Sequence, residues 1–239
     1  MWRTILVVIV FGTLFAGLAE RAWSDTQKHE EMLYTSVRVQ NIASDGVGSG
    51  TVYMVDGEYS YILAAAHVVE NAYDDRVVVT FYPTGEAHVA DVMTTSFKFD
   101  LALLKVKHVH PYVALVANQS PPVFTEVWNI GAAIGMPVFP TFGIVSRYDA
   151  EYNLMQTSAQ VVDGMSGGGT FYYDGEHYVM TGVIRSIMTV PIRPTDVQSV
   201  EGVEPSGLSE RLPFISHSET VESVHVFLSA MCRQTGFGC

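Results

Sequence analysis

Charged residues are scarce in this sequence, and positively charged ones are the scarcest. There are 13 Lys and Arg against 25 Asp and Glu, so the formal net charge is −12, and charged residues make up only 16% of the chain. Proteins that bind nucleic acid through its phosphates need a basic surface, so we expect no nucleic-acid partner. Hydrophobic residues account for 48% of the 239 positions. Intrinsic disorder is therefore excluded, because disordered chains combine low hydrophobicity with many charges.

Cysteine is almost absent, since Cys232 and Cys239, close to the C-terminus, are the only two. In an oxidising compartment they can form a disulfide that closes a small terminal loop, and otherwise they are two free thiols. The sequence leaves both alternatives open. We do not expect either cysteine to be catalytic, because chain ends are commonly mobile.

Long hydrophobic runs are also absent, except for one at the N-terminus. Residues 4–19 carry no charge, follow Arg3 and end in small residues. This pattern predicts a secretory signal peptide, with cleavage after Ala19 or Ser24. The alternative is an uncleaved membrane anchor, although this run is at or below the lower length limit for spanning about 30 Å of hydrocarbon. We therefore expect residues 1–24 to direct export, to the periplasm or out of the cell, with anchoring through this run as the alternative.

Helical periodicity is missing from most of the remaining chain. After a polar stretch at residues 25–31, which we expect to be a linker, short runs rich in β-branched and aromatic residues alternate with Gly, Pro and Asp turn signals. Such a pattern is typical of β-barrels and β-sandwiches. The runs form two groups, at about 35–110 and 122–215. Apolar residues recur at helical spacing only over about 219–231, which predicts a C-terminal helix before a tail at 233–239.

Three short motifs hold residues that can carry out nucleophilic catalysis together. Ser166 lies in a glycine-rich turn, where the backbone can aim two N–H groups at one point. His67 ends an apolar strand, and Asp100 begins another. A serine needs a base to take its proton, and the base needs a carboxylate to orient it. Each motif alone is common in structural roles, but the order His, Asp, Ser across two β halves indicates a catalytic triad.

These motifs resemble the trypsin-like (chymotrypsin-fold) serine proteases, and most closely the protease domain of the HtrA/Deg type. The resemblance runs from about Val37 to Leu228, within a domain that we place at 25–232. Its segments follow in the order of that family: GSGTV at 48–52, AAAHVV at 64–69, DLALLKV at 100–106, GIVS at 143–146, GMSGG at 164–168 and TGVI at 181–184.

The resemblance implies an all-β fold of two packed six-stranded antiparallel β-barrels (chymotrypsin-like) with a C-terminal α-helix. His67 and Asp100 would come from the first barrel and Ser166 from the second. By resemblance, Ser166 is the nucleophile, His67 the general base and then acid, and Asp100 the group that orients the imidazole. The N–H groups of Gly164 and Ser166 match the oxyanion hole. Protein or peptide substrates are implied, with no cofactor.

The substrate-binding residues follow from the same resemblance. The strand of Gly182, Val183, Ile184 and Arg185 is expected to pair with the extended substrate backbone. Gln160 occupies the position at which trypsin-type enzymes carry an aspartate, so we do not expect a preference for Lys or Arg at the cleavage site. Arg185 either lines the specificity pocket, where it would accept an acidic residue, or points to solvent.

Two features depart from the family pattern. Met165 replaces the aspartate of the digestive enzymes and the asparagine of the HtrA type, so activation through an ion pair at this position is excluded. Its side chain either disturbs the oxyanion loop or points into the barrel. HtrA proteins also usually carry PDZ domains after the protease domain, and we expect none here. The oligomeric state is not predicted.

Other interpretations remain open. The motif at Ser166 also fits the nucleophile elbow of α/β-hydrolases, in which Asp196 and His217 would complete an esterase triad, but a strand-like segment follows where a helix is needed. A catalytically impaired homologue that binds peptides is a further alternative. His108 and His110 have alternating spacing with no further ligands clustered in the sequence, so we expect no metal site there.

Overall fold

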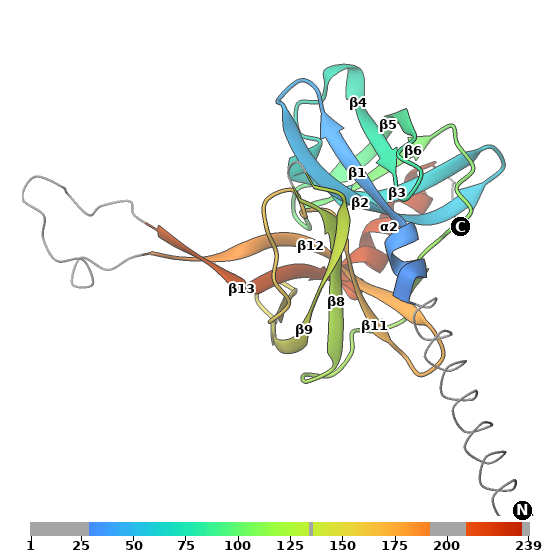
Figure 1. Ribbon diagram of the computed structural model, residues 1–239. Helices are drawn as coiled ribbons and strands as arrows, with labels where there is room; N and C mark the ends of the chain where they lie inside the picture. Colours follow the sequence, from blue (N-terminus) through green and yellow to red (C-terminus); the bar gives the residue numbers. More distant parts are fainter. Residues whose placement is uncertain (1–28, 134–135, 192–208, 236–239) are drawn as a thin grey trace, which may run out of the picture.

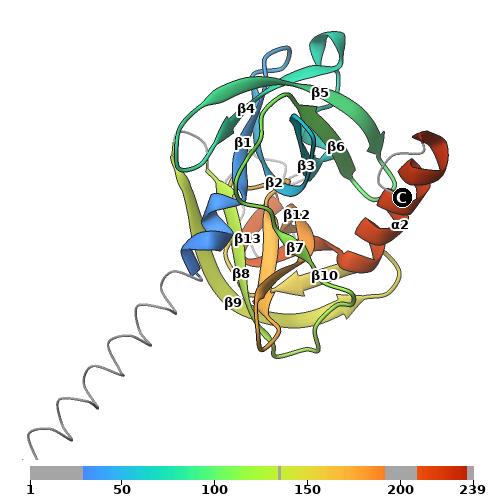
Figure 2. The same cartoon turned by 90° about the vertical axis from the view of Figure 1, so that its right-hand side faces the viewer.

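The structure is a computed structural model that describes residues 29–133, 136–191 and 209–235. It is built almost entirely from β-strands arranged as two stacked barrels, with one long helix along their side (Figures 1 and 2). The chymotrypsin-like fold class expected from the sequence is confirmed. The predicted signal peptide or anchor lies outside the described residues. No helix within the described part of the chain is long and apolar enough to cross a bilayer.

The first barrel is closed and antiparallel, in the order β1-β2-β3-β6-β5-β4. Its interior is filled by small and branched apolar side chains, among them Val39, Ile62 and Leu104, which are completely buried. Alternation along each strand places these side chains inward. The strands are β1 (Ser36–Asn41), β2 (Gly46–Asp56), β3 (Tyr59–Ala65), β4 (Arg76–Phe81), β5 (Ala87–Ser96) and β6 (Leu101–Val106), with short 3-10 helices η1 (Ala66–Val68) and η2 (Tyr73–Asp75).

The second barrel has the strand order β11-β8-β9-β10-β13-β12 and is closed by pairing between β11 and β12. The short β7 (Leu115–Val116) adds to β12 in parallel. Beyond the barrel, β12 and β13 continue as a paired ribbon, which projects from the body of the molecule in Figure 1. The barrel strands are β8 (Glu126–Ala132), β9 (Val138–Asp149), β10 (Leu154–Thr157), β11 (Gly169–Tyr173), β12 (Tyr178–Pro191) and β13 (Ser209–Thr220).

The terminal helix α2 runs over Val221–Thr235, so β13 occupies the first residues that the sequence analysis assigned to the helix. Its apolar face packs against both barrels, with Val224, Phe227 and Met231 buried in the main core cluster. Cys232 lies in this helix and is disulfide-bonded. The other cysteine, Cys239, lies outside the described residues.

The polar stretch before β1 is not wholly a linker, because residues 29–34 are helical. Met32 is 3% exposed and joins the core cluster shared by the two barrels, while His29 Nε2 lies 2.7 Å from the hydroxyl of Tyr178. These contacts explain why the segment folds onto the domain. The polar composition of this segment led to the prediction of a linker. A short helix can nevertheless bury one face when only every third or fourth residue is apolar.

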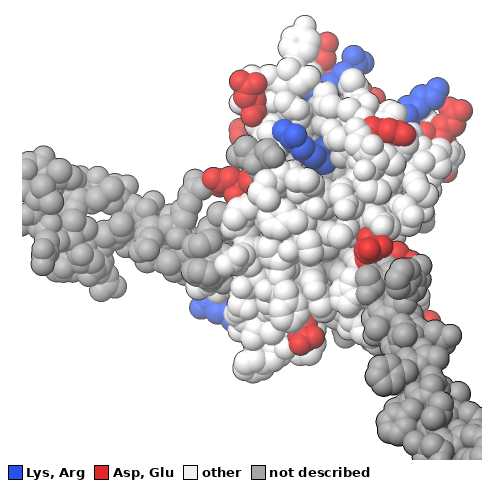
Figure 3. Space-filling model, viewed as in Figure 1, with Lys and Arg blue, Asp and Glu red and all other residues white. Residues whose placement is uncertain are grey.

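Charged side chains are sparse on the face of the molecule shown in Figure 3, and the basic ones lie apart from one another. This arrangement agrees with the low content of Lys and Arg in the sequence. Over this face, the surface has no concentration of positive charge of the kind that phosphate binding requires.

Candidate active site

His67 and Asp100 form a closely bonded pair at one end of the first barrel. His67 lies in η1, directly after β3, and Asp100 directly precedes β6, which pairs with β3. His67 Nδ1 lies 2.7 Å from Asp100 Oδ2, and the backbone N–H of His67 donates to Asp100 Oδ1 at 3.0 Å. Both carboxylate oxygens are therefore used to hold one histidine. The imidazole remains accessible, since the side chain of His67 is 46% exposed and that of Asp100 only 10%.

The backbone at Asp100 supports this pairing. Asp100 has a φ of +49°, a left-handed conformation that aspartate tolerates better than most residues. Its carbonyl oxygen accepts a hydrogen bond from the N–H of Ala66 at 3.1 Å. Asp100 thus bonds η1 through its backbone carbonyl, to Ala66, and through its carboxylate, to His67. These bonds fix the position of the imidazole relative to the barrel.

Ser166 lies in the loop between β10 and β11 of the second barrel. The loop is bonded to its surroundings by its backbone: Ser166 O accepts from Ser49 N at 2.8 Å, and Gly167 N donates to Ile184 O at 2.7 Å. Gly167 has a φ of +89°, and a Cβ there would lie 2.7 Å from the backbone nitrogen of Ala65. Only glycine permits this approach, which brings the serine loop against the strand that leads to His67.

Two backbone N–H groups in this loop are free to bind a ligand. Within the described part of the chain, neither the N–H of Gly164 nor that of Ser166 donates to another group. Gly164 has a φ of +97°, which glycine adopts without strain. Its carbonyl accepts from Ser49 Oγ at 2.7 Å, while Met165 N donates to Val162 O at 3.1 Å. The peptide between Gly164 and Met165 is thereby held at both ends.

The hydroxyl of Ser166 is bonded to the second barrel. Ser166 Oγ donates to the carbonyl oxygen of Arg185 at 3.3 Å, and among the described residues no hydrogen bond joins it to His67. The structure therefore brings His67 and Asp100 into direct contact, while the hydroxyl of Ser166 is turned toward β12.

Arg185 lies between the serine and the aspartate. Its carbonyl accepts from Ser166 Oγ, and its Nε lies 3.9 Å from Asp100 Oδ2. Its Nη1 donates to Glu219 Oε1 at 2.7 Å. Arg185 therefore does not point freely to solvent: its side chain is 33% exposed and pairs with Glu219, a residue that the sequence analysis did not identify. That Arg185 lines the specificity pocket stays a prediction.

Glu219 is 1% exposed. Burial raises the pKa of its carboxyl to about 7, although the neighbouring Arg185 lowers it. His217, two residues earlier on β13, has its pKa lowered by burial and by the charge of Arg185. Glu219, whose carboxyl titrates near neutrality, thus contacts Arg185, and Arg185 in turn lies beside Asp100 of the candidate catalytic pair.

Met165 and Gln160 have opposite environments. The side chain of Met165 is completely buried and packs with Val161, Ile184 and Phe139. Of the two alternatives considered from the sequence, the one in which this side chain points into the barrel is confirmed. Gln160 is exposed, and its carbonyl accepts from Thr141 Oγ1 at 2.5 Å.

The expected substrate strand is already paired over most of its length. Gly182 and Val183 pair with β11 on one side and with β13 on the other. The N–H of Ile184 donates to Gly168 O at 2.8 Å, and its carbonyl oxygen accepts from Gly167 N. The backbone of these three residues cannot receive an added strand, which corrects the sequence-based expectation. The edge of β12 that is not paired with β11 begins at Arg185.

Ser49, which the sequence analysis did not single out, joins three parts of the site. It lies on β2 of the first barrel, and its Oγ donates to Gly164 O and accepts from the N–H of Ala132 on β8 at 2.8 Å. The side chain is completely buried. A serine between two glycines in a strand is an unusual choice for a barrel interior, and this was the one signal available in the sequence.

Comparison with known proteins identifies the family. Residues 48–179 match the model of the trypsin-like peptidase domain. The chain belongs to this family. Several curated relatives that match it are named as DegP-like or HtrA serine proteases. A probable periplasmic serine endoprotease DegP-like of Halomonas elongata is 33% identical over 137 residues, which cover 54% of this chain and 28% of that protein.

One further curated relative and one solved structure are similar to this chain. The magnetosome formation protease MamE of Paramagnetospirillum magneticum is 27% identical over 209 residues, covering 81% of this chain and 27% of that protein. A serine endoprotease from Yersinia pestis has a similar fold, with a TM-score of 0.66 and 23% identity over 87% of this chain and 66% of that one. This trypsin-like chain thus spans little more than a quarter of the length of the curated relatives named here.

The trypsin-like fold removes the nucleophile-elbow interpretation. An α/β-hydrolase needs a helix directly after its serine, whereas Ser166 is followed by strand β11. Asp196, the candidate acid of that alternative, lies outside the described residues. His217 lies on β13, and its Nε2 is 2.8 Å from Gln156 Nε2. An esterase of that fold is therefore excluded.

Proposed function

We propose that this chain is an exported serine endopeptidase of the HtrA/Deg type, acting on proteins or peptides. The observation that carries the proposal is the two-point bonding of His67 by Asp100, next to a serine loop with two free backbone N–H groups. A buried carboxylate on Nδ1 leaves Nε2 of the same ring as the base. Export is proposed because of the sequence of residues 1–24 and because relatives are named as periplasmic proteases.

The reaction uses these groups in two steps. His67 Nε2 takes the proton of Ser166 as Oγ attacks the substrate carbonyl, and the N–H groups of Gly164 and Ser166 stabilise the oxyanion. His67 then gives the proton to the leaving amine, which produces an acyl-enzyme. Water, deprotonated by the same imidazole, hydrolyses the ester and restores the serine. Asp100 holds the ring and stabilises the imidazolium throughout.

Substrate binding completes this arrangement. Ser166 Oγ bonds Arg185 O in the structure, and this carbonyl is the first acceptor on the open edge of β12. An extended substrate that donates a backbone N–H to Arg185 O would replace the serine there and leave its hydroxyl free to rotate toward His67. Gln160 brings no negative charge to the pocket, so cleavage after uncharged residues is proposed. Val162 is 38% exposed and compatible with a small aliphatic substrate residue, whereas Val161 and Val183 are buried in core clusters.

The alternative function is peptide binding without catalysis. It is favoured by one observation, namely that Ser166 Oγ bonds Arg185 O and not His67. A fluorophosphonate probe distinguishes the two, because it reacts only with an activated serine. We expect labelling of the wild type and none of Ser166→Ala or His67→Ala. A wild-type protein that is folded by circular dichroism, yet stays unlabelled and does not cleave casein, would refute the catalytic function. Peptide binding by that protein would then be needed to support the alternative.

A further inference from the structure

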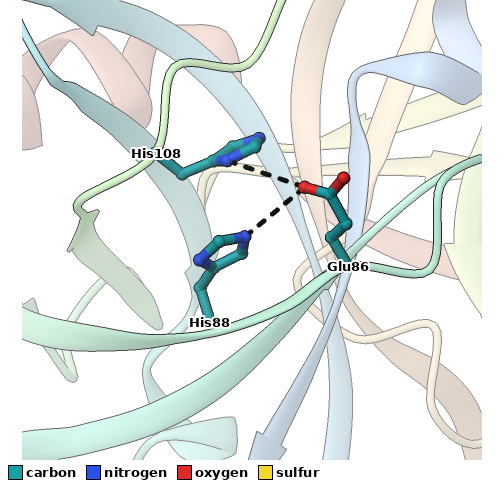
Figure 4. A group of neighbouring side chains, drawn as sticks. All are labelled: Glu86, His88 and His108. Atoms are coloured by element: carbon teal, nitrogen blue, oxygen red, sulfur yellow. Dashed lines mark ion pairs between the residues drawn. The ribbon is translucent and has the colours of Figure 1, made fainter.

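Three side chains of the first barrel converge on one point that is separate from the triad. They are Glu86, at the end of the turn between β4 and β5, His88 on β5 and His108 just after β6 (Figure 4). Their ligand atoms all lie within 4.8 Å of one another. His88 Nε2 is 3.6 Å and His108 Nδ1 3.9 Å from the same carboxylate oxygen, Glu86 Oε2.

The register of the barrel explains why the two histidines meet. Strands β5 and β6 are antiparallel with Ala90 opposite Val106, so continuing the pairing by two residues brings His88 opposite His108 on the same face. The sequence analysis considered His108 with His110 and found no further ligand, because His88 is distant in the sequence. His110 itself is used elsewhere, with its Nε2 2.6 Å from the carbonyl oxygen of Tyr34.

The backbone around the three residues is held in place. Glu86 O accepts from the N–H of Phe81 at 2.9 Å in the β4–β5 hairpin, and His108 O accepts from Ser60 Oγ at 2.6 Å. The Phe81 ring lies against His108, with 4.4 Å between ring centroids. The backbone of Glu86 and of His108 is thus fixed by hydrogen bonds to neighbouring strands, and His88 lies on β5, which favours a preformed site over an accidental approach of surface side chains.

The separations suit a tetrahedral ion. Ligands about 2.0–2.1 Å from a tetrahedral Zn²⁺ lie roughly 3.3 Å from one another. The two carboxylate–imidazole separations of 3.6 and 3.9 Å need a small contraction. The two imidazole nitrogens, which lie within 4.8 Å of each other, must also approach to that separation. In addition, His88 Nε2 is a buried atom with no hydrogen-bond partner among the described residues. A buried nitrogen without a partner is costly, and a metal ion at this point would satisfy it.

We propose that Glu86, His88 and His108 bind a divalent transition metal ion of the Zn²⁺ class, which ties the β4–β5 hairpin to the segment after β6. Two imidazoles and one carboxylate are a donor set that Zn²⁺ favours, while Mg²⁺ and Ca²⁺ require oxygen ligands. Asp100 precedes β6 and His108 follows it, so the site lies on the order of 20 Å from the candidate triad along that strand. With three protein ligands, the tetrahedral ion keeps one position for water. Because of its distance from the candidate triad, the ion is proposed to stabilise the barrel and not to take part in peptide hydrolysis.

The test is titration of the purified, untagged protein with ZnSO₄ by calorimetry, together with thermal unfolding in Zn²⁺ and in chelator. We expect one equivalent of Zn²⁺ to bind and to raise the Tm of the protein. Excess Mg²⁺ should not weaken this binding. Co²⁺ should give the visible absorption of a tetrahedral complex. His88→Ala, His108→Ala and Glu86→Gln should each weaken Zn²⁺ binding by about tenfold or more, since each removes one of three ligands.

The matched control is His177→Gln, which removes an exposed histidine at the tip of the β11–β12 turn. It should bind Zn²⁺ as the wild type does. Glu86→Gln changes an exposed side chain and keeps its shape, so it tests the site even if a histidine variant does not fold. The proposal is overturned if the wild type shows no one-to-one binding, or if Glu86→Gln and the folded histidine variants bind as tightly as His177→Gln.

Discussion

The guanidinium of Arg185 lies beside the carboxylate of Asp100, with 3.9 Å between Nε and Oδ2. The same arginine donates to the buried Glu219 at 2.7 Å, and its carbonyl accepts from Ser166 Oγ. One residue of β12 therefore contacts both the acid and the candidate nucleophile of the site. The negative charge of Asp100 stabilises the imidazolium form of His67. A cation in this place partly offsets that negative charge and so weakens the stabilisation.

Removing this cation should change the pH dependence of catalysis. In the double variant Arg185→Gln, Glu219→Gln the charge beside Asp100 is lost without leaving a buried carboxylate unpaired. Asp100 then has His67 as its remaining charged partner and stabilises the imidazolium more strongly, so the acidic limb of the kcat/KM profile should shift to higher pH. The measurement is kcat/KM for a peptide substrate across pH 5–9. An unchanged profile would mean that Arg185 serves only packing.

Glu219 should make the stability of the protein depend on pH. Its pKa is raised from 4.5 to about 7 by burial, so the folded state holds a proton that the unfolded state has released. Stability is then greatest below pH 4.5 for this group and decreases as pH rises toward 7, by up to about 3 kcal/mol.

The measurement for Glu219 is urea unfolding of the wild type and of Glu219→Gln at several pH values between 4.5 and 8. The difference in free energy of unfolding should move in favour of the variant as pH rises. A difference that stays constant over this range would show that Glu219 does not titrate there.

Ser49→Ala should impair both stability and turnover. The substitution removes the hydroxyl that joins Gly164 O to the N–H of Ala132, and both groups are left without that partner. We expect a loss of about 1–3 kcal/mol in the free energy of unfolding. We also expect kcat to fall by about tenfold with little change in KM, because the oxyanion loop loses a bond that orients it.

A matched control for Ser49 lies on the same strand. Thr51 Oγ1 is buried and has no hydrogen-bond partner among the described residues, so Thr51→Val removes a hydroxyl of similar burial that bonds nothing there. This variant should keep wild-type kcat and stability. If Ser49→Ala behaves like Thr51→Val, the bonds of Ser49 have no role in catalysis.

Much of this protein could be predicted from its sequence. The two groups of strands, the terminal helix and the trypsin-like family follow from local alternation and from motifs such as those at His67 and Ser166, and the structure and the comparisons confirm them. These properties are encoded in short stretches of chain, where periodicity and turn residues act over a few positions.

The tertiary structure decided how distant residues meet. Three sets of contacts join residues that are distant in the sequence: the pairing of Arg185 with Glu219, the bonds of Ser49 to the serine loop, and the meeting of Glu86 with two histidines. The same is true of the paired backbone at Gly182, which closes most of the expected substrate strand. Such contacts depend on strand register and on how the two barrels pack. A shift of one residue in register would send each side chain to the opposite face, and no local pattern in the sequence specifies that register completely.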